Sequence, residues 1–182
     1  MVSGLLNDPV WLTASSLGLS LLFALAGWHK WRDRAGFAAV LHNYAVLPER
    51  LVAAFAVLLP WFEVALAAGL LLPSLRLPAA LLAAALLLGY AAVMALTLLQ
   101  GRRIADCGCE VGVQRQAVSA ALVWRNLLLA LLALNILQAP SCRELGLFDW
   151  LVTGAVLLCG CVFYLLANTL IANQHSAREL SL

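Results

Sequence analysis

Residues 77–101 read LPAALLAAALLLGYAAVMALTLLQG, a run without a single Asp, Glu, Lys or Arg. An α-helix needs about 20 apolar residues to cross the ~30 Å hydrocarbon core of a bilayer. Further windows with at most one charged residue each occupy residues 9–28, 51–75, 116–142 and 150–177. The sequence therefore predicts an all-α membrane protein with about five transmembrane helices, at residues 9–29, 51–72, 78–99, 117–138 and 149–172.

The overall composition excludes a water-soluble protein. Of 182 residues, 64% are hydrophobic and 11% are charged, whereas a soluble domain carries about 25% charged residues. Eleven basic against nine acidic residues, without basic clusters, give no nucleic-acid footprint. Asp8, and no Lys or Arg, precedes the first apolar run, so we expect a membrane helix there rather than a cleaved signal peptide. We expect one integral membrane domain over residues 1–182.

The segment between the first two predicted spans has its own pattern. Phe37, Val40, Leu41 and Tyr44 recur at the spacing of one helix face. This segment is too short to span a bilayer, so it predicts an amphipathic half-helix beside a four-helix bundle and a fifth helix. The half-helix either anchors the chain at the membrane surface or lies over the mouth of the bundle as a lid.

A Cys-Gly-Cys motif, Cys107 to Cys109, lies in the loop before the fourth span, on the same side as the half-helix. A disulfide between two cysteines this close departs from relaxed geometry, and strained disulfides are oxidising and labile. Arg102 and Arg103 nearby favour the thiolate, and Asp106 opposes it. The pair is therefore suited to thiol–disulfide exchange. Inert structural thiols and a metal site completed by distant residues remain open alternatives.

Three further cysteines have other settings. Cys159 and Cys161 fall two residues apart within the fifth predicted helix, where such residues do not face one another. We expect them to pack as small hydrophobic residues. Cys142 falls in the loop on the opposite side from Cys107 and is not expected to pair with it.

Two charged residues fall inside predicted spans. By helical rise, Glu63 lies ~18 Å and Arg125 ~12 Å from the side that carries the half-helix. An isolated charge at that depth is costly. We expect Glu63 and Arg125 to face each other, or to share a polar cavity with Asn126 beneath the cysteine loop. Alternatively, an ion pair there fixes helix packing and does nothing else.

The sequence resembles the MauE-type methylamine-utilisation accessory membrane proteins, which are grouped with DoxX-like four-helix proteins. The resemblance covers about residues 25–126 and rests on these spaced features: Phe23 to Lys30, Phe37, Tyr44, Leu47-Pro48, Leu59-Pro60-x-x-Glu63, Gly69, Gly101-Arg102, Cys107-Gly108-Cys109 and Arg125-Asn126. Residues 110–112 read Glu-Val-Gly, where the family commonly has an aromatic residue and a glycine. This departure concerns the shape of the loop rather than the cysteine pair.

The resemblance implies a thiol–disulfide redox protein that helps a disulfide-rich periplasmic methylamine dehydrogenase to mature, acting with a thioredoxin-like partner. The layout also resembles membrane disulfide oxidases that use a quinone, which implies a quinone between the helices near Lys30, Glu63 or Arg125. Two alternatives are a non-enzymatic scaffold for the thioredoxin-like partner and a DoxX-like subunit of a quinol-linked complex.

Two arguments from the sequence give opposite orientations in the bacterial inner membrane. The half-helix and cysteine loops carry seven basic residues, against two on the other side before the fifth span: Lys30, Arg32, Arg34, Arg50, Arg102, Arg103 and Arg115, against Arg76 and Arg143. The positive-inside rule places these seven in the cytoplasm. Disulfide formation in a periplasmic client requires the opposite, because disulfides persist in the periplasm. We expect the periplasmic placement, with the basic residues serving the site.

Overall fold

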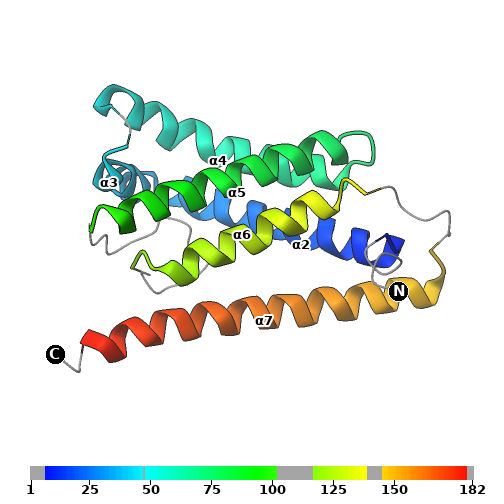
Figure 1. The fold of residues 1–182 in the computed structure, drawn as a ribbon. Helices are drawn as coiled ribbons and strands as arrows, with labels where there is room; N and C mark the ends of the chain where they lie inside the picture. The colour runs from blue at the N-terminus through cyan, green and yellow to red at the C-terminus, as the bar shows by residue number, and fades with distance from the viewer. Residues whose placement is uncertain (1–6, 47, 102–116, 139–144, 180–182) are drawn as a thin grey trace.

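The computed structural model describes residues 7–46, 48–101, 117–138 and 145–179, and no strand occurs among them (Figure 1). The helices, in chain order, are α2 (Pro9–Arg32), α3 (Arg34–Tyr44), α4 (Glu49–Leu71), α5 (Arg76–Leu99), α6 (Ala120–Asn135) and α7 (Leu147–Glu179). The predicted all-α fold is confirmed.

Within the described ranges, four helices are long and apolar enough to cross a membrane: α2, α4, α5 and α7 over Leu147–Asn173. The fourth predicted span is shorter than expected, because α6 has 16 residues, a length of ~24 Å, where the sequence predicted a helix over 117–138. The chain turns at residues 136–138, so the helix ends before its apolar window does.

Local capping sets the ends of the first two helices. Val10 donates its backbone N–H to Asp8 Oδ1 at 2.9 Å, and Pro9 occupies the first turn of α2. Asp33 separates α2 from α3 and accepts a hydrogen bond from the backbone N–H of Gly36 at 2.9 Å. Ala45 ends α3 in the left-handed conformation, with φ 50°. The predicted half-helix is therefore a distinct element with its own caps.

The half-helix α3 lies over one mouth of the bundle. Its apolar face is buried, and Val40 and Tyr44 pack in one cluster with Met94 of α5 and Leu122 of α6. Figure 1 shows α3 at the end of the molecule where α5 finishes and α6 starts. The structure thus has the predicted position over the bundle mouth.

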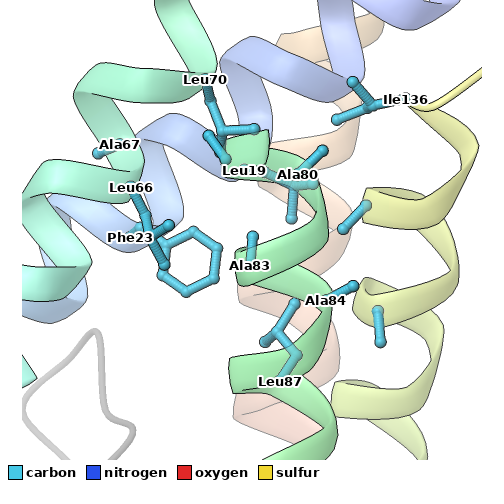
Figure 2. Close-up of a cluster of buried hydrophobic side chains, with 13 residues drawn as sticks. Leu19, Phe23, Leu66, Ala67, Leu70, Ala80, Ala83, Ala84, Leu87 and Ile136 are labelled. Carbon is cyan, nitrogen blue, oxygen red and sulfur yellow. The ribbon is translucent and has the colours of Figure 1, made fainter. Parts of the chain in front are cut away.

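Small residues bring the central helices close together. The main core joins α2, α4, α5 and α6 (Figure 2), and Ala80, Ala83 and Ala84 of α5 are almost fully buried in it. Membrane helices gain no hydrophobic stabilisation by associating, since lipid tails are as apolar as Leu, and therefore depend on close packing. The Ser20 hydroxyl adds one polar contact by donating to the backbone carbonyl of Ala67 at 2.8 Å.

Gly27 lies directly against the backbone of α4. A Cβ atom added there would lie 2.9 Å from the Pro60 carbonyl oxygen and 2.9 Å from Val64 Cγ2. Because the first of these is a backbone atom, the helices would have to separate to admit a side chain. Gly27 therefore sets the α2–α4 distance three residues before Lys30.

We expect Gly27→Ala to lower the stability of the protein by about 1–3 kcal/mol through overpacking. Gly89→Ala in α5 is the matched control, because nothing lies within 4 Å of a Cβ added at Gly89. Thermal unfolding in detergent should show a clear loss for Gly27→Ala and no loss for Gly89→Ala. Equal melting temperatures for the two variants would contradict the close packing of α2 on α4.

Candidate functional site

A buried ion pair joins α2 to α4. Lys30 Nζ donates to both carboxylate oxygens of Glu63, at 2.7 Å to Oε1 and 2.8 Å to Oε2. Lys30 is 6% exposed and Glu63 is 1% exposed. Charge-assisted bonds of this length are strong, and the pairing offsets the cost of holding either charge away from water.

Two aromatic residues enclose this ion pair. The Tyr90 hydroxyl of α5 donates to Glu63 Oε1 at 2.6 Å. Lys30 Nζ lies 5.5 Å from the ring centroids of both Tyr90 and Phe37, the latter from α3. The half-helix thus covers the pair with an aromatic face, which attracts the ammonium group.

Lys30 and Glu63 pair although they lie at different distances along their helices from the half-helix side. Glu63 lies 14 residues after the first residue of α4, but it contacts Lys30 in the last turn of α2. The first half of α4 therefore extends past the end of α2, where α3 packs against it. The buried charges lie beneath the half-helix.

Arg125 of α6 is held by α7 instead. Its Nη1 donates to Asn168 Oδ1 at 2.8 Å, and its guanidinium carbon lies 5.7 Å from the centroid of the Tyr164 ring. Its buried Nε–H has no hydrogen-bond partner among the described residues. Within the described part of the chain, one donor of this side chain is therefore left unsatisfied.

A small cavity of about 20 Å³ lies between these groups, lined by Lys30, Glu63 and Tyr90 on one side and by Arg125 and Asn126 on the other. Asn126 is buried and donates to the Leu122 carbonyl oxygen at 2.9 Å. The structure thus has the shared polar cavity of Glu63, Arg125 and Asn126, whereas the salt bridge of Glu63 is made with Lys30. The cavity has room for about one water molecule.

The structure places only some of the other residues considered in the sequence. Arg102, Cys107, Cys109 and Cys142 fall outside the described residues. Cys159 and Cys161 are free thiols on α7, facing a separate crevice.

Sequence reasoning missed three polar partners: Tyr90, Tyr164 and Asn168. Each is a polar side chain within an apolar helix. Such residues usually face the bundle interior and pair with one another. That rule, applied to uncharged as well as charged residues, would have singled out Tyr90 and Asn168.

The model of the family described as methylamine utilisation protein MauE matches residues 9–139. The chain belongs to the MauE family. It is 44% identical to the methylamine utilization protein MauE of Paracoccus denitrificans over 131 residues, which is 72% of this chain and 70% of that protein. It is 39% identical to the Paracoccus versutus protein of the same name over 162 residues, 88% of this chain and 86% of that protein.

A third MauE protein, from Methylorubrum extorquens, is 35% identical over 150 residues, 82% of this chain and 81% of that protein. No solved structure matches the chain. The region matched by the MauE family model extends from α2 to α6 and so contains the ion pair, Tyr90 and Arg125. It stops before α7, which supplies Asn168 and Tyr164.

We expect Glu63→Gln to destabilise this MauE-family chain by about 3–5 kcal/mol, because it leaves Lys30 buried without a countercharge. Lys30→Met should do the same to Glu63. The double variant Lys30→Met/Glu63→Gln should lose less than the sum of the two single changes. Chemical unfolding of the four proteins in detergent measures this coupling.

The exposed His42–Glu49 contact, at 3.5 Å, supplies the control. Glu49→Gln should leave stability within experimental error, since an exposed pair contributes little. Additive losses in the double variant would show that Lys30 and Glu63 do not depend on each other.

Proposed function

We propose that this protein serves methylamine utilisation as a thiol–disulfide redox protein of the bacterial inner membrane. Cys107 and Cys109 act as the exchanging pair, with a thioredoxin-like periplasmic protein as partner and a methylamine dehydrogenase-like enzyme with disulfides as client. The names of the relatives support the pathway, and the Cys-Gly-Cys motif supports the chemistry.

The observation that carries the proposal is the position of the cysteine segment's two flanks. Leu98 precedes this segment and Val118 follows it, and both pack in the cluster that holds α3 on the bundle. The Lys30–Glu63 pair lies beneath the same half-helix. A packed bundle end on both sides of the segment supports a site that receives a protein partner.

The proposed exchange conserves electrons and protons. A thiolate of the partner attacks the Cys107–Cys109 disulfide and forms a mixed disulfide, releasing one thiolate of the pair. The partner's second thiol then displaces the other cysteine. The partner dithiol is oxidised to a disulfide, and the Cys107–Cys109 pair gains two electrons and two protons. A membrane quinone, reduced to quinol by the same two electrons and two protons, returns the pair to the disulfide.

The positive-inside count against the periplasmic orientation falls from seven basic residues to six when buried Lys30 is left out. Lys30 is buried and paired with Glu63, so it contributes no loop charge to the positive-inside count. Arg34 lies 5.7 Å from the Trp31 ring centroid, in contact with an aromatic cluster at this end. Part of the positive excess therefore has a structural role.

Labelling of intact cells with a membrane-impermeant maleimide tests the proposal. We expect Cys107 and Cys109 to be labelled from outside after reduction and protected before it, with Cys107→Ser abolishing maturation of the client. Labelling that is the same with and without reductant, together with full maturation of the client in Cys107→Ser, would favour the scaffold function. Loss of maturation in Glu63→Gln but not in Cys107→Ser would favour a DoxX-like subunit of a quinol-linked complex.

A further inference from the structure

Three exposed tryptophans gather on the outer surface of the bundle where α2 ends. Trp28 and Trp31 come from the last two turns of α2, and Trp61 comes from the middle of α4. The ring centroids of Trp28 and Trp31 are 5.6 Å apart, and those of Trp31 and Trp61 are 5.4 Å apart. The three side chains are 53%, 42% and 54% exposed, in chain order. They form one aromatic surface across two helices, the tryptophan cluster.

The length of α2 places this cluster at the depth of the lipid headgroups. Trp11 lies in the first turn of α2, and Trp31 follows it by 20 residues, a distance of ~30 Å along a helix. The hydrocarbon core of a bilayer is also ~30 Å thick, and tryptophans are enriched at both of its surfaces. Trp11 and the tryptophan cluster therefore mark the two surfaces of the membrane.

Two basic side chains accompany the cluster. Arg34, the first residue of α3, has its guanidinium carbon 5.7 Å from the centroid of the Trp31 ring. Arg32 follows Trp28 by four residues, so both lie on one face of α2. Both arginines are exposed, and neither forms a salt bridge with a described residue. The carboxylate of Asp33, between them in sequence, accepts a backbone N–H at the start of α3. The surface therefore carries an excess of positive charge.

The cluster also has unused hydrogen-bond donors. Within the described ranges, no residue accepts the indole N–H of Trp28, Trp31 or Trp61, whereas Trp11 donates to Asn135 at 2.9 Å. Tryptophan at a membrane surface places its ring among apolar groups and its N–H among polar ones. A phosphate oxygen accepts hydrogen bonds from guanidinium groups and from indole N–H groups alike. The donors present therefore fit a phosphate group.

The face of α2 that leads to the cluster is suited to an amphipathic ligand. Leu21, Leu25, Trp28 and Arg32 follow one another at spacings of four, three and four residues, and all four are exposed. Such spacings keep residues on one face of a helix. Along this face the surface changes from aliphatic to aromatic and then to cationic. A phospholipid has the same order of groups from its acyl chains to its phosphate, which a soluble anion or an acidic peptide lacks.

We propose that the tryptophan cluster, with Arg32 and Arg34, binds an anionic phospholipid. The phosphate accepts hydrogen bonds from the two guanidinium groups and from the indole N–H groups, and an acyl chain lies along Leu25 and Leu21. The excess of positive charge favours an anionic headgroup over a zwitterionic one, because each basic residue near the surface adds to the attraction. This inference is independent of the proposed redox function.

Arg50 provides a matched control for Arg34. It lies in the first turn of α4, is exposed, and has no cation–π contact or salt bridge with a described residue. Arg34→Gln and Arg50→Gln each remove one positive charge from an exposed side chain. Surface changes of this kind have little effect on stability, so both variants should remain folded.

The full-length protein would be reconstituted into phosphatidylcholine vesicles that contain increasing fractions of phosphatidylglycerol with brominated acyl chains, which quench the fluorescence of nearby tryptophans. A parallel series uses brominated phosphatidylcholine. We expect half-maximal quenching at a lower fraction of the brominated phosphatidylglycerol. Arg34→Gln should raise that fraction about fivefold, and Arg50→Gln should leave it nearly unchanged.

Tryptophan variants assign the quenching to the cluster. The double variant Trp28→Phe/Trp61→Phe should lose most of the difference between the two brominated lipids. Trp124→Phe/Trp150→Phe removes two other exposed tryptophans, which are 66% and 55% exposed, and should keep the difference.

Equal quenching of the wild-type protein by the two brominated lipids would overturn the lipid site. A preference that survives Arg34→Gln, or that Arg50→Gln weakens as much, would overturn it too, because the attraction would then not depend on the cluster. Protection of the cluster from both lipids, together with a detergent-solubilised dimer that Arg34→Gln dissociates, would assign this surface to a second copy of the chain instead.

Discussion

The ion pair between Lys30 and Glu63 constrains the whole end of the bundle that carries the candidate site. A single charge inside a membrane protein is costly, so each of these residues requires the other, and α2 and α4 must meet where both can reach. That requirement places the last turn of α2 against the middle of α4. The first half of α4 is then left without α2 beside it, and the half-helix α3 fills that position with Phe37 over the ammonium group. The ion pair and the half-helix are therefore two parts of one arrangement.

Close packing makes this pairing possible. Gly27 lets the backbone of α4 approach α2 one turn before Lys30, and the buried alanines of α5 let α4 and α6 approach it from either side. Apolar side chains are as stable in contact with lipid as in contact with protein. These contacts therefore gain their stability from close packing and hydrogen bonds rather than from exclusion of water. Tyr90 supplies one such bond by bringing its hydroxyl to Glu63 from α5. Three helices thus meet at a single carboxylate.

Much of the fold can be predicted from the stretches of sequence that lack charged residues. Uncharged windows locate the long helices, and the spacing of Phe37, Val40 and Tyr44 locates the half-helix, because burial periodicity is a local property of the chain. Which residues form pairs between helices is not a local property of the chain. Depth counting paired Glu63 with Arg125 by assuming that every helix starts at one level, and the overhang of α4 breaks that assumption. Lys30 counted as a loop charge by its place in the sequence, although three-dimensional packing buries it.

Glu63 and Arg125, the two charged residues predicted inside the spans, differ in how fully the described residues satisfy their hydrogen bonds. The Glu63 carboxylate accepts from the Lys30 ammonium with both oxygens and from the Tyr90 hydroxyl with one, so a ligand there would have to displace an existing bond. Arg125, by contrast, has a buried Nε–H with no hydrogen-bond partner among the described residues. A buried donor without a partner carries a standing free-energy cost, which a ligand with a suitably placed acceptor would relieve. The Lys30–Glu63 pair therefore fixes the shape of this end of the bundle, whereas Arg125 has a hydrogen-bond donor that no described residue uses.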